Sequence, residues 1–162
     1  MELVLYGDDD LGLTEAIETD PAVMKELGGP VAREKIPAIH RRRVEAVAKG
    51  AWWFKIVPEP AGGAAGTVGI WEHEWRGERV HEMGWMVLPA FQRRGLAGAA
   101  ASLLLERARA EGRFKTIVAF PAVANAASNA ICRKLGFSRL EDFDYDYQGR
   151  PLRCAHWRLA LT

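Results

Sequence analysis

Residues 84–111 constrain the fold more than any other stretch, because they combine a strand, a stop, a basic loop and a long helix. Gly84-Trp85-Met86-Val87-Leu88 has the aromatic and β-branched content of a strand. Pro89 ends it, since proline cannot donate to a sheet ladder. An Ala/Leu-rich run then predicts a helix that continues to about Glu111. Chains of this pattern place a helix start directly after the end of a strand.

The loop before that helix predicts an anion site, most simply a phosphate site. Gln92 and the residues after it open the helix with several unpaired backbone N–H groups. Arg93 and Arg94 stand beside these donors and the positive end of the helix dipole. Gly95 and Ala97 lack bulk, so a ligand's phosphates can approach the backbone closely.

Composition excludes several classes of protein. The 162 residues, 49% hydrophobic and 27% charged, predict one globular domain over residues 1–162. A formal net charge of +1 argues against bulk binding to nucleic acid or an anionic membrane. Cys132 and Cys154 form neither a disulfide framework nor a metal-ligand spacing, so we expect no metal and a reducing cytoplasm. No signal pattern and no apolar run of ~20 residues is present.

The remaining pattern predicts an α/β fold. Strands are expected at 2–6, 51–57, 67–71, 80–88, 114–120, 139–147 and 152–161, and helices at 14–27 (interrupted at Asp20-Pro21), 33–49, 96–111 and 125–135. The nearly all-apolar strand at 114–120 suits burial on both faces. Residues 80–120 therefore form a βαβ crossover with parallel strands, within a central mixed sheet that has helices on both faces. In the helix at 33–49, we expect Arg41-Arg42-Arg43 to lie mostly on the solvated face.

The helix at 125–135 carries a polar stripe. The residues at positions i, i+3, i+4 and i+7 are Asn125, Ser128, Asn129 and Cys132. On another side, Ala127, Ile131 and Leu135 are expected to pack down. This helix and the basic loop each follow the C-terminal end of a parallel strand, where ligands of open α/β sheets collect. Two independent stretches are thus predicted to face one crevice.

Both stretches resemble motifs of one family. Gln92-Arg93-Arg94-Gly95-Leu96-Ala97 resembles the Gln/Arg-x-x-Gly-x-Gly/Ala signature of the GNAT superfamily of acyl-CoA-dependent N-acetyltransferases. The segment from Asn125 to Lys134-Leu135-Gly136-Phe137 is similar to its second motif. The motifs occur in the family's order, and the resemblance is close over about residues 80–137. Ser128 and the two early helices look most like the branch that includes ribosomal-protein N-terminal acetyltransferases.

The resemblance implies a GNAT-like fold with acetyl-CoA as cosubstrate. In such a fold the strand ending at Leu88 splays from the strand ending at Phe120, and the acyl-CoA arm lies in the gap. Backbone groups of the first strand would pair with the pantetheine, and the amides of the basic loop would hold the pyrophosphate. The cofactor-binding residues so implied are Met86, Val87, Leu88, Gln92, Arg93, Arg94, Gly95, Leu96, Ala97, Asn125 and Ser128.

The implied reaction transfers an acetyl group to a primary amine of a small molecule or a peptide N-terminus, by direct attack in a ternary complex. An ammonium group with a pKa of ~10 must lose a proton. Glu82 is the candidate base, directly or through water, because it lies on the face of Gly84 and Met86; a rim glutamate without a catalytic role is the alternative. A backbone N–H near Val87 would stabilise the thioester oxygen.

The departing thiolate needs a proton or a hydrogen bond, and Ser128 and Cys132 are the candidate acids. The family often has a tyrosine where Cys132 stands, so the chain departs from the pattern there. A thiol with a pKa of ~8.5 can donate, but a buried cysteine is more often inert packing. A serine at a helix start often serves only the local hydrogen bonding. A mechanism in which no side chain acts as the acid also stays open.

The acceptor side is less well determined. Acidic residues predominate in the segment that faces the family's acceptor pocket, which favours a cationic amine: Glu72, Glu74, Glu78 and Glu82 outnumber Arg76 and Arg79. One or two of Trp52, Trp53, Trp71, Trp75 and Trp85 are expected to wall this pocket. His73 and His81 are read as ordinary exposed histidines.

Two other functions compete with catalysis. A non-catalytic acyl-CoA-binding sensor of the same fold would bind the cofactor without transferring the acyl group. A nucleotide binder is disfavoured, because neither a Gly-x-Gly-x-x-Gly after the first strand nor a P-loop lysine is present. A homodimer is expected from the family and from the frequency of two-fold oligomers.

Overall fold

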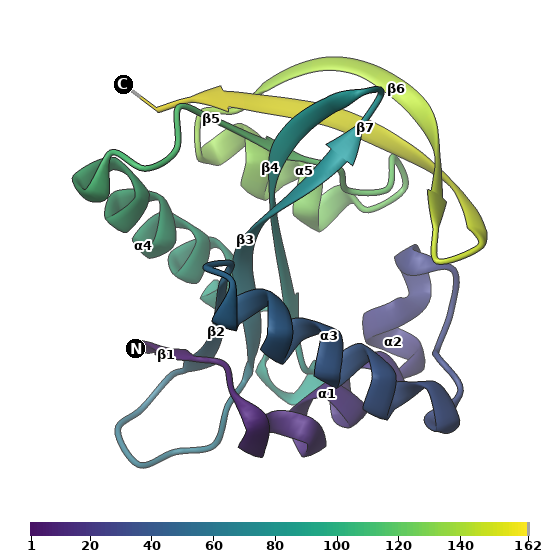
Figure 1. Ribbon diagram of the computed structural model, residues 1–162, viewed down its shortest axis with the longest axis vertical. Coiled ribbons are helices and arrows are strands. Elements are labelled where there is room, and N and C mark those ends of the chain that lie inside the picture. The colour runs from purple at the N-terminus through teal and green to yellow at the C-terminus, as the bar shows by residue number, and fades with distance from the viewer. Residues whose placement is uncertain (162) are drawn as a thin grey trace.

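Seven strands form one mixed sheet in the computed structural model, which describes residues 1–161. They are β1 (Glu2–Leu5), β2 (Trp52–Val57), β3 (Gly66–Trp75), β4 (Glu78–Val87), β5 (Thr116–Ala119), β6 (Ser138–Tyr147) and β7 (Arg150–Ala160). Their order across the sheet is β1-β2-β3-β4-β5-β7-β6 (Figure 1). Two-residue turns at Arg76-Gly77 and Gln148-Gly149 join β3 to β4 and β6 to β7.

The β4–β5 pair is parallel, whereas the other neighbouring strands run antiparallel. This arrangement confirms the predicted βαβ unit. Glu82 lies opposite Val118 in the parallel pair, and β5 ends at Ala119. β4 continues along β3 to Val87, which lies opposite Gly66. The two parallel strands therefore part beyond Glu82 and leave a gap at the C-terminal end of β4.

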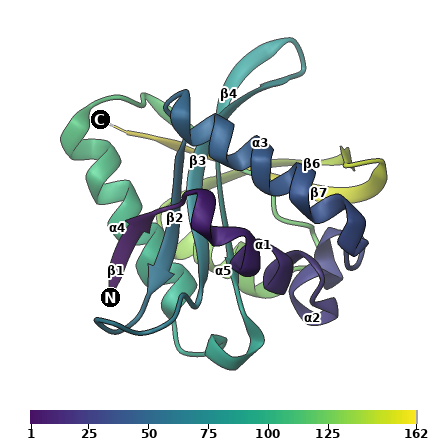
Figure 2. The ribbon, with the colours of Figure 1, turned by 60° about the horizontal axis from the view of Figure 1, so that its bottom comes forward.

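Helices cover both faces of the sheet, as predicted. They are α1 (Leu11–Glu18), α2 (Pro21–Met24), α3 (Ile36–Ala48), α4 (Leu96–Glu111) and α5 (Ala126–Lys134), with 3-10 turns at Asp8–Asp10, Lys25–Leu27, Arg33–Lys35 and Pro89–Phe91. α4 and α5 lie on one face and α1–α3 on the other (Figures 1 and 2). Asp20 separates α1 from α2, because its carboxylate accepts from the N–H groups of Ala22 and Val23 at 2.8 and 3.0 Å. Within residues 1–161, no helix has the length and apolar character that a bilayer crossing requires.

Each face of β4 belongs to a different hydrophobic core, because successive side chains of a strand point to opposite sides. Met83 and Val87 pack into the main core beneath α4, with Leu104 and Leu105. Met86 packs against a smaller core made by α2, α3 and the loop between them. Glu82, Gly84 and Met86 therefore share the α1–α3 side, as the strand pattern predicts.

The arginine run of α3 divides between two environments. Arg41 and Arg42 are exposed as predicted, but Arg43 is only 9% exposed, so the expected solvated position was wrong for this residue. Its guanidinium pairs with the buried Glu18 carboxylate and lies 4.7 Å from the centre of the Trp53 ring. The physical reason is helical spacing: Arg43 follows Ile39 by four residues and so continues the buried stripe.

Candidate active site

The last residues of β4 turn backbone groups toward the gap. The Leu88 N–H donates to the Ala65 carbonyl at 2.8 Å, on the β3 side. Because backbone groups alternate in direction along a strand, the N–H and C=O of Val87 face away from β3. Gln92 Nε2 donates to the Val87 carbonyl at 2.9 Å from that side. Val87 can therefore pair with a ligand in the gap, whereas the Leu88 N–H is already engaged.

The loop after β4 forms a concave run of N–H donors. Arg93 and Gly95 both have left-handed backbone conformations, with φ of 61° and 72°. Gly95 is the N-cap of α4 and supplies no side-chain cap, so the first N–H groups of the helix remain available. A Cβ added at Gly95 would meet no atom within 4 Å, since the position opens onto a cavity. Such a run of donors at a helix start suits an anion.

A cavity of about 820 Å³ extends from this loop between α4 and α5. From the loop and α4 it is lined by Gln92, Arg93, Gly95, Leu96 and Ala97. Lys25 and Lys134 add positive charge to its lining. Lys134 belongs to the second sequence motif, whereas no sequence pattern marked Lys25. Arg94 does not line it; the Arg94 guanidinium lies 5.8 Å from the Phe91 ring centre.

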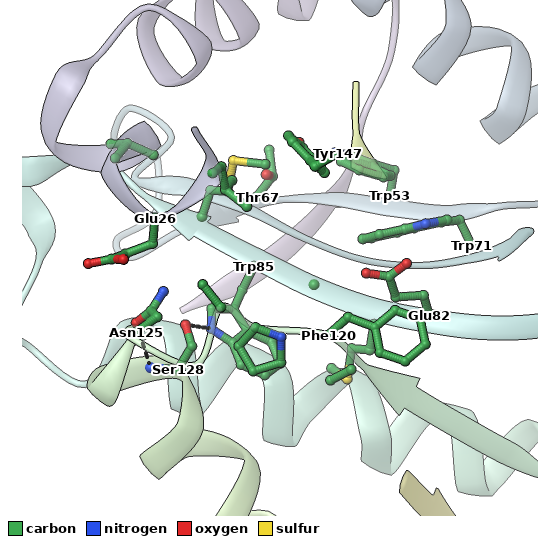
Figure 3. Close-up of a pocket in the computed structure, with 18 of the residues that line it drawn as sticks. Glu26, Trp53, Thr67, Trp71, Glu82, Trp85, Phe120, Asn125, Ser128 and Tyr147 are labelled. Atoms are coloured by element: carbon green, nitrogen blue, oxygen red, sulfur yellow. Dashed lines mark hydrogen bonds between the residues drawn. The ribbon is translucent and has the colours of Figure 1, made fainter. Parts of the chain in front are cut away.

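A smaller cavity of about 150 Å³ lies on the α1–α3 side of β3 and β4. Three tryptophans and a phenylalanine contribute to its walls: Trp53, Trp71, Trp85 and Phe120. Figure 3 shows Glu82 at one end, between Trp71 and Phe120, and Asn125 and Ser128 at the other end with Glu26. Tyr147 and Thr67 line the side nearest Trp53. The pocket is thus aromatic, with carboxylates at both ends.

The two cavities meet at a shared boundary. Five residues line both of them: Val23, Glu26, Trp85, Asn125 and Ser128. The Ser128 N–H donates to Asn125 Oδ1 at 3.0 Å, which caps α5, and Ser128 Oγ accepts from Trp85 Nε1 at 3.2 Å. Having accepted that bond, the serine hydroxyl keeps its own proton to donate.

Glu82 is half-enclosed in the smaller cavity. Its side chain is 15% exposed, and Oε2 lies 2.7 Å from His73 Nε2. Gly84, the next residue on this face, is required by close packing: a Cβ there would lie 2.6 Å from an atom of the Trp71 ring. The absent side chain lets Trp71 lie across β4 beside the Glu82 carboxylate.

The predicted polar stripe of α5 is divided between the boundary and the core. Asn125 and Ser128 line the cavities, but Asn129 and Cys132 are buried beneath the helix. Asn129 is satisfied there, because its amide donates to the Ala122 carbonyl at 2.9 Å and accepts from Trp157 Nε1 at 2.8 Å. Cys132 lines neither cavity, and burial raises the pKa of its thiol to about 12.

The apolar side of α5 faces the large cavity, which is lined by Ala127, Ile131 and Leu135. Leu135 also packs against the main core as expected, whereas Ala127 is exposed, so the expectation was wrong for Ala127. The buried Asn129–Trp157 bond joins α5 to β7 and brings together residues 28 positions apart.

Among the acidic residues of the β3–β4 hairpin that the structure describes, Glu82 alone lines the small cavity. Glu72, Glu74 and Glu78 line neither cavity among the described residues. Glu72 lies on the opposite face of the sheet, 3.5 Å from His81 Nε2. Strand alternation separates it from Glu82, so the prediction that these acids together face the acceptor was wrong.

Other lining residues escaped the sequence analysis. Glu26 comes from the turn after α2, Arg43 from α3, Thr67 from β3 and Tyr147 from the end of β6. No local motif marks them, because they reach the pocket from separate elements. Only Arg43 carried a usable signal, the four-residue spacing from Ile39. Within residues 1–161, no group of three or more His, Cys, Asp or Glu residues is placed to hold a metal ion.

A mixed sheet with one splayed parallel pair, a donor-rich loop and two adjoining cavities defines an acyl-CoA-dependent acyltransferase of the GNAT type. The family model described as "Acetyltransferase (GNAT) domain" matches residues 1–138. The chain therefore belongs to the GNAT acetyltransferases and is an acetyl-CoA-dependent N-acetyltransferase. No curated protein sequence matches it significantly.

Solved structures share the fold along nearly the whole chain. The ribosomal-protein-alanine N-acetyltransferase of Brucella melitensis is 22% identical, with a TM-score of 0.79, covering 99% of this chain and 100% of that one. The spermidine N-acetyltransferase of Vibrio cholerae, solved with CoA and spermine, is 16% identical, with a TM-score of 0.80 and coverages of 99% and 95%. The yncA protein of Salmonella typhimurium, solved with acetyl-CoA, is 22% identical, with a TM-score of 0.74 and coverages of 100% and 95%. At these identities the likeness concerns the fold.

Proposed function

We propose that the large cavity holds acetyl-CoA, the small cavity holds a primary amine, and the acetyl group passes directly between them in a ternary complex. One observation carries this proposal: the two cavities share a boundary at Trp85, Asn125 and Ser128. A thioester reaching that boundary from the basic loop would meet an amine held near Glu82. No covalent enzyme intermediate is needed, because donor and acceptor lie in adjoining spaces.

The residues that line the large cavity fit the chemistry of coenzyme A. The N–H groups from Gln92 to Ala97, with Arg93 and the two lysines, suit the phosphates. The apolar side of α5 suits the pantetheine arm, and the backbone of Val87 supplies a strand edge for its amides. Of Met86, Val87 and Leu88, which were expected to pair with that arm, Val87 has its N–H and C=O turned away from β3 and toward the gap. Gln92 holds the Val87 carbonyl, so its role is to orient the strand edge.

Three groups of the chain meet the demands of the reaction. Glu82 accepts the proton of the ammonium group, directly or through a water molecule. The Val87 N–H donates to the acetyl oxygen as negative charge develops on it, as an oxyanion hole does. Ser128 donates a proton toward the departing thiolate. We assign no such role to Cys132, because a buried thiol with a pKa of about 12 lies outside both cavities.

The acceptor is a cationic amine with a slim or flat group beside the nitrogen. Carboxylates at both ends of the small cavity favour a positive charge, and the indole rings between them favour cation–π contact. Arg43 does not offset this preference, because the Glu18 carboxylate neutralises it.

Ser128 and the early helices support placing this chain in the branch of ribosomal-protein N-terminal acetyltransferases. The continuous sheet supports a single domain over residues 1–162.

An acceptor panel tests the function. Purified protein is incubated with acetyl-CoA and diamines, aminoglycosides, amino acids or peptides with free N-termini, and the products are identified by mass spectrometry. We expect acetylation of amines that carry net positive charge. Binding of acetyl-CoA by calorimetry without any acetylated product would instead indicate the sensor, and absence of binding would remove the cofactor assignment.

A further inference from the structure

His73 faces Glu82 across the β3–β4 hairpin, although its own side chain does not line either cavity. Nε2 lies 2.7 Å from Glu82 Oε2, and Nδ1 lies 3.1 Å from the backbone carbonyl of Glu74. The ring is held edge-on to Phe120, with centroids 6.3 Å apart. The side chain of His73 is 23% exposed, and its Nε2 atom is buried.

The proton positions at this contact follow from the geometry. The carbonyl of Glu74 can only accept, so Nδ1 must carry a hydrogen. An unprotonated Nε2 and a carboxylate oxygen are both acceptors, so a contact of 2.7 Å favours the protonated imidazole and an ion pair with Glu82. The carboxylate oxygen lies off the direction of the Nε2–H bond, so the contact is an ion pair and not an aligned hydrogen bond. This ion pair engages Oε2 of Glu82 and leaves Oε1 for the cavity.

We propose that His73 is a positioning residue for the acetyl transfer, which holds the Glu82 carboxylate so that its second oxygen faces the acceptor amine. The inference rests on the proposed role of Glu82. His73 touches neither the cofactor nor the acceptor. The orientation of the proposed base, Glu82, then depends on one titratable proton of His73. When that proton leaves, two acceptor atoms face each other and the carboxylate loses its fixed position.

Among the titratable groups near Glu82, His73 is the one whose protonation changes in the range of the test. The contact with the Glu82 carboxylate raises the pKa of His73 above its ordinary value, so the proton is retained above pH ~6.5 and is lost as the pH rises through the raised pKa. Tyr145 and Tyr147 of β6 and Cys154 of β7 also face Glu82. Burial raises the pKa of Tyr145 to about 12 and of Cys154 to about 11, and it also raises that of Tyr147, so these three stay neutral.

The same hairpin supplies a matched control. His81 lies 3.5 Å from Glu72 on the opposite face of the sheet, so it repeats the His–Glu pairing away from the cavity. His73→Gln keeps a donor toward Glu82 but cannot titrate, whereas His73→Ala removes the donor. Together with His81→Ala as the control, these variants separate positioning from general effects on the hairpin.

Steady-state kinetics between pH 6 and pH 10 test the proposal. We expect His73→Ala to lower kcat about tenfold with the acetyl-CoA KM unchanged. His73→Gln should retain most of the activity and lose the alkaline decline, while His81→Ala should match the wild type. Equal losses in His73→Ala and His81→Ala, or an alkaline decline that persists in His73→Gln, would overturn the proposal.

A second measurement stands apart from turnover. NMR titration of the His73 imidazole should give a pKa above its ordinary value of ~6.5, and Glu82→Gln should lower that pKa. A His73 pKa that does not respond to Glu82→Gln would refute the ion pair. If the ion pair is present and no amine is acetylated, the proposed function fails while the His73–Glu82 contact stands.

Discussion

The indole N–H of Trp85 donates to Ser128 Oγ at 3.2 Å, at the boundary between the two cavities. Trp85 comes from the splayed half of β4 and Ser128 from the first turn of α5. The bond thus joins the two stretches that the sequence motifs single out. It orients the hydroxyl with its lone pair toward the indole, which leaves the serine proton for another acceptor.

Ser128→Ala should lower kcat about a hundredfold, because it removes the proposed proton donor to the leaving thiolate. The acetyl-CoA KM should change little, since the N-cap bond from the residue-128 N–H to Asn125 is made by the backbone. Release of free thiol measures the rate. Ser138→Ala, at an exposed position, is the control; unchanged kcat in Ser128→Ala would leave the reaction without a side-chain acid.

Glu82→Gln should lower turnover about a hundredfold while the affinity for acetyl-CoA, measured by calorimetry, stays the same. The amide has nearly the shape of the carboxylate but cannot accept the ammonium proton. Glu72→Gln changes the same residue type on the opposite face of the same hairpin and should be silent. Equal turnover in wild type and Glu82→Gln would exclude Glu82 as the base.

Gly95→Val should abolish acetyl-CoA binding. The new side chain would project into the large cavity beside the N–H donors, and the left-handed φ of 72° adds a strain of about 1–3 kcal/mol. Gly112→Val is the matched control, because Gly112 caps the other end of α4 with φ of 63° and also has no atom within 4 Å of an added Cβ. Both variants should lose similar thermal stability, but only Gly95→Val should lose binding in calorimetry.

Cys132→Ala should keep its kcat and lose about 1 kcal/mol of stability, because the side chain is fully buried in the main core. A thiol with a pKa of about 12 remains protonated at pH 7–9, so the native protein should resist alkylation at this position. Thermal melting and mass spectrometry after iodoacetamide treatment measure the two effects. A large fall in kcat without a change in Tm would restore Cys132 as a candidate acid.

Arg43→Met should destabilise the protein by about 3–5 kcal/mol, because it leaves the buried Glu18 carboxylate without its partner. The double variant Glu18→Gln with Arg43→Met removes both charges and should recover a large part of this loss. Chemical denaturation measures the free energies of unfolding. Additive losses in the double variant would show that the two charges do not stabilise each other.

The donor-rich loop, which is the proposed cofactor half of the site, could be predicted from the sequence because its chemistry is local. Pro89 ends the strand, Gly95 permits the left-handed turn, and the first N–H groups of α4 lack partners within the helix. The N-cap at Asn125 was predictable for the same reason. The βαβ unit pairs strands far apart in the chain, and it was predicted from the order of its elements and the handedness rule instead.

The acceptor half required the tertiary structure. Trp53, Glu82 and Tyr147 come from β2, β4 and β6. No sequence motif indicates that these three strands bring their side chains to one pocket. The buried bond between Asn129 and Trp157 ties α5 to β7, and the periodicity of the helix does not encode that contact. Arg43 lies on the buried side of α3 because of its spacing from Ile39, but only the tertiary structure supplies the Glu18 carboxylate of α1 that pairs with it.

What the sequence by itself determined is the family and the donor-rich loop that we propose to hold the cofactor. The tertiary structure decided which side chains line the small cavity, and it placed His73 against Glu82. The physical reason is the sequence separation of the interacting residues. Caps, turns and helix starts are stabilised by residues nearby in the chain. The walls of a pocket are formed by packing between distant elements, and no local sequence pattern encodes how those elements are oriented.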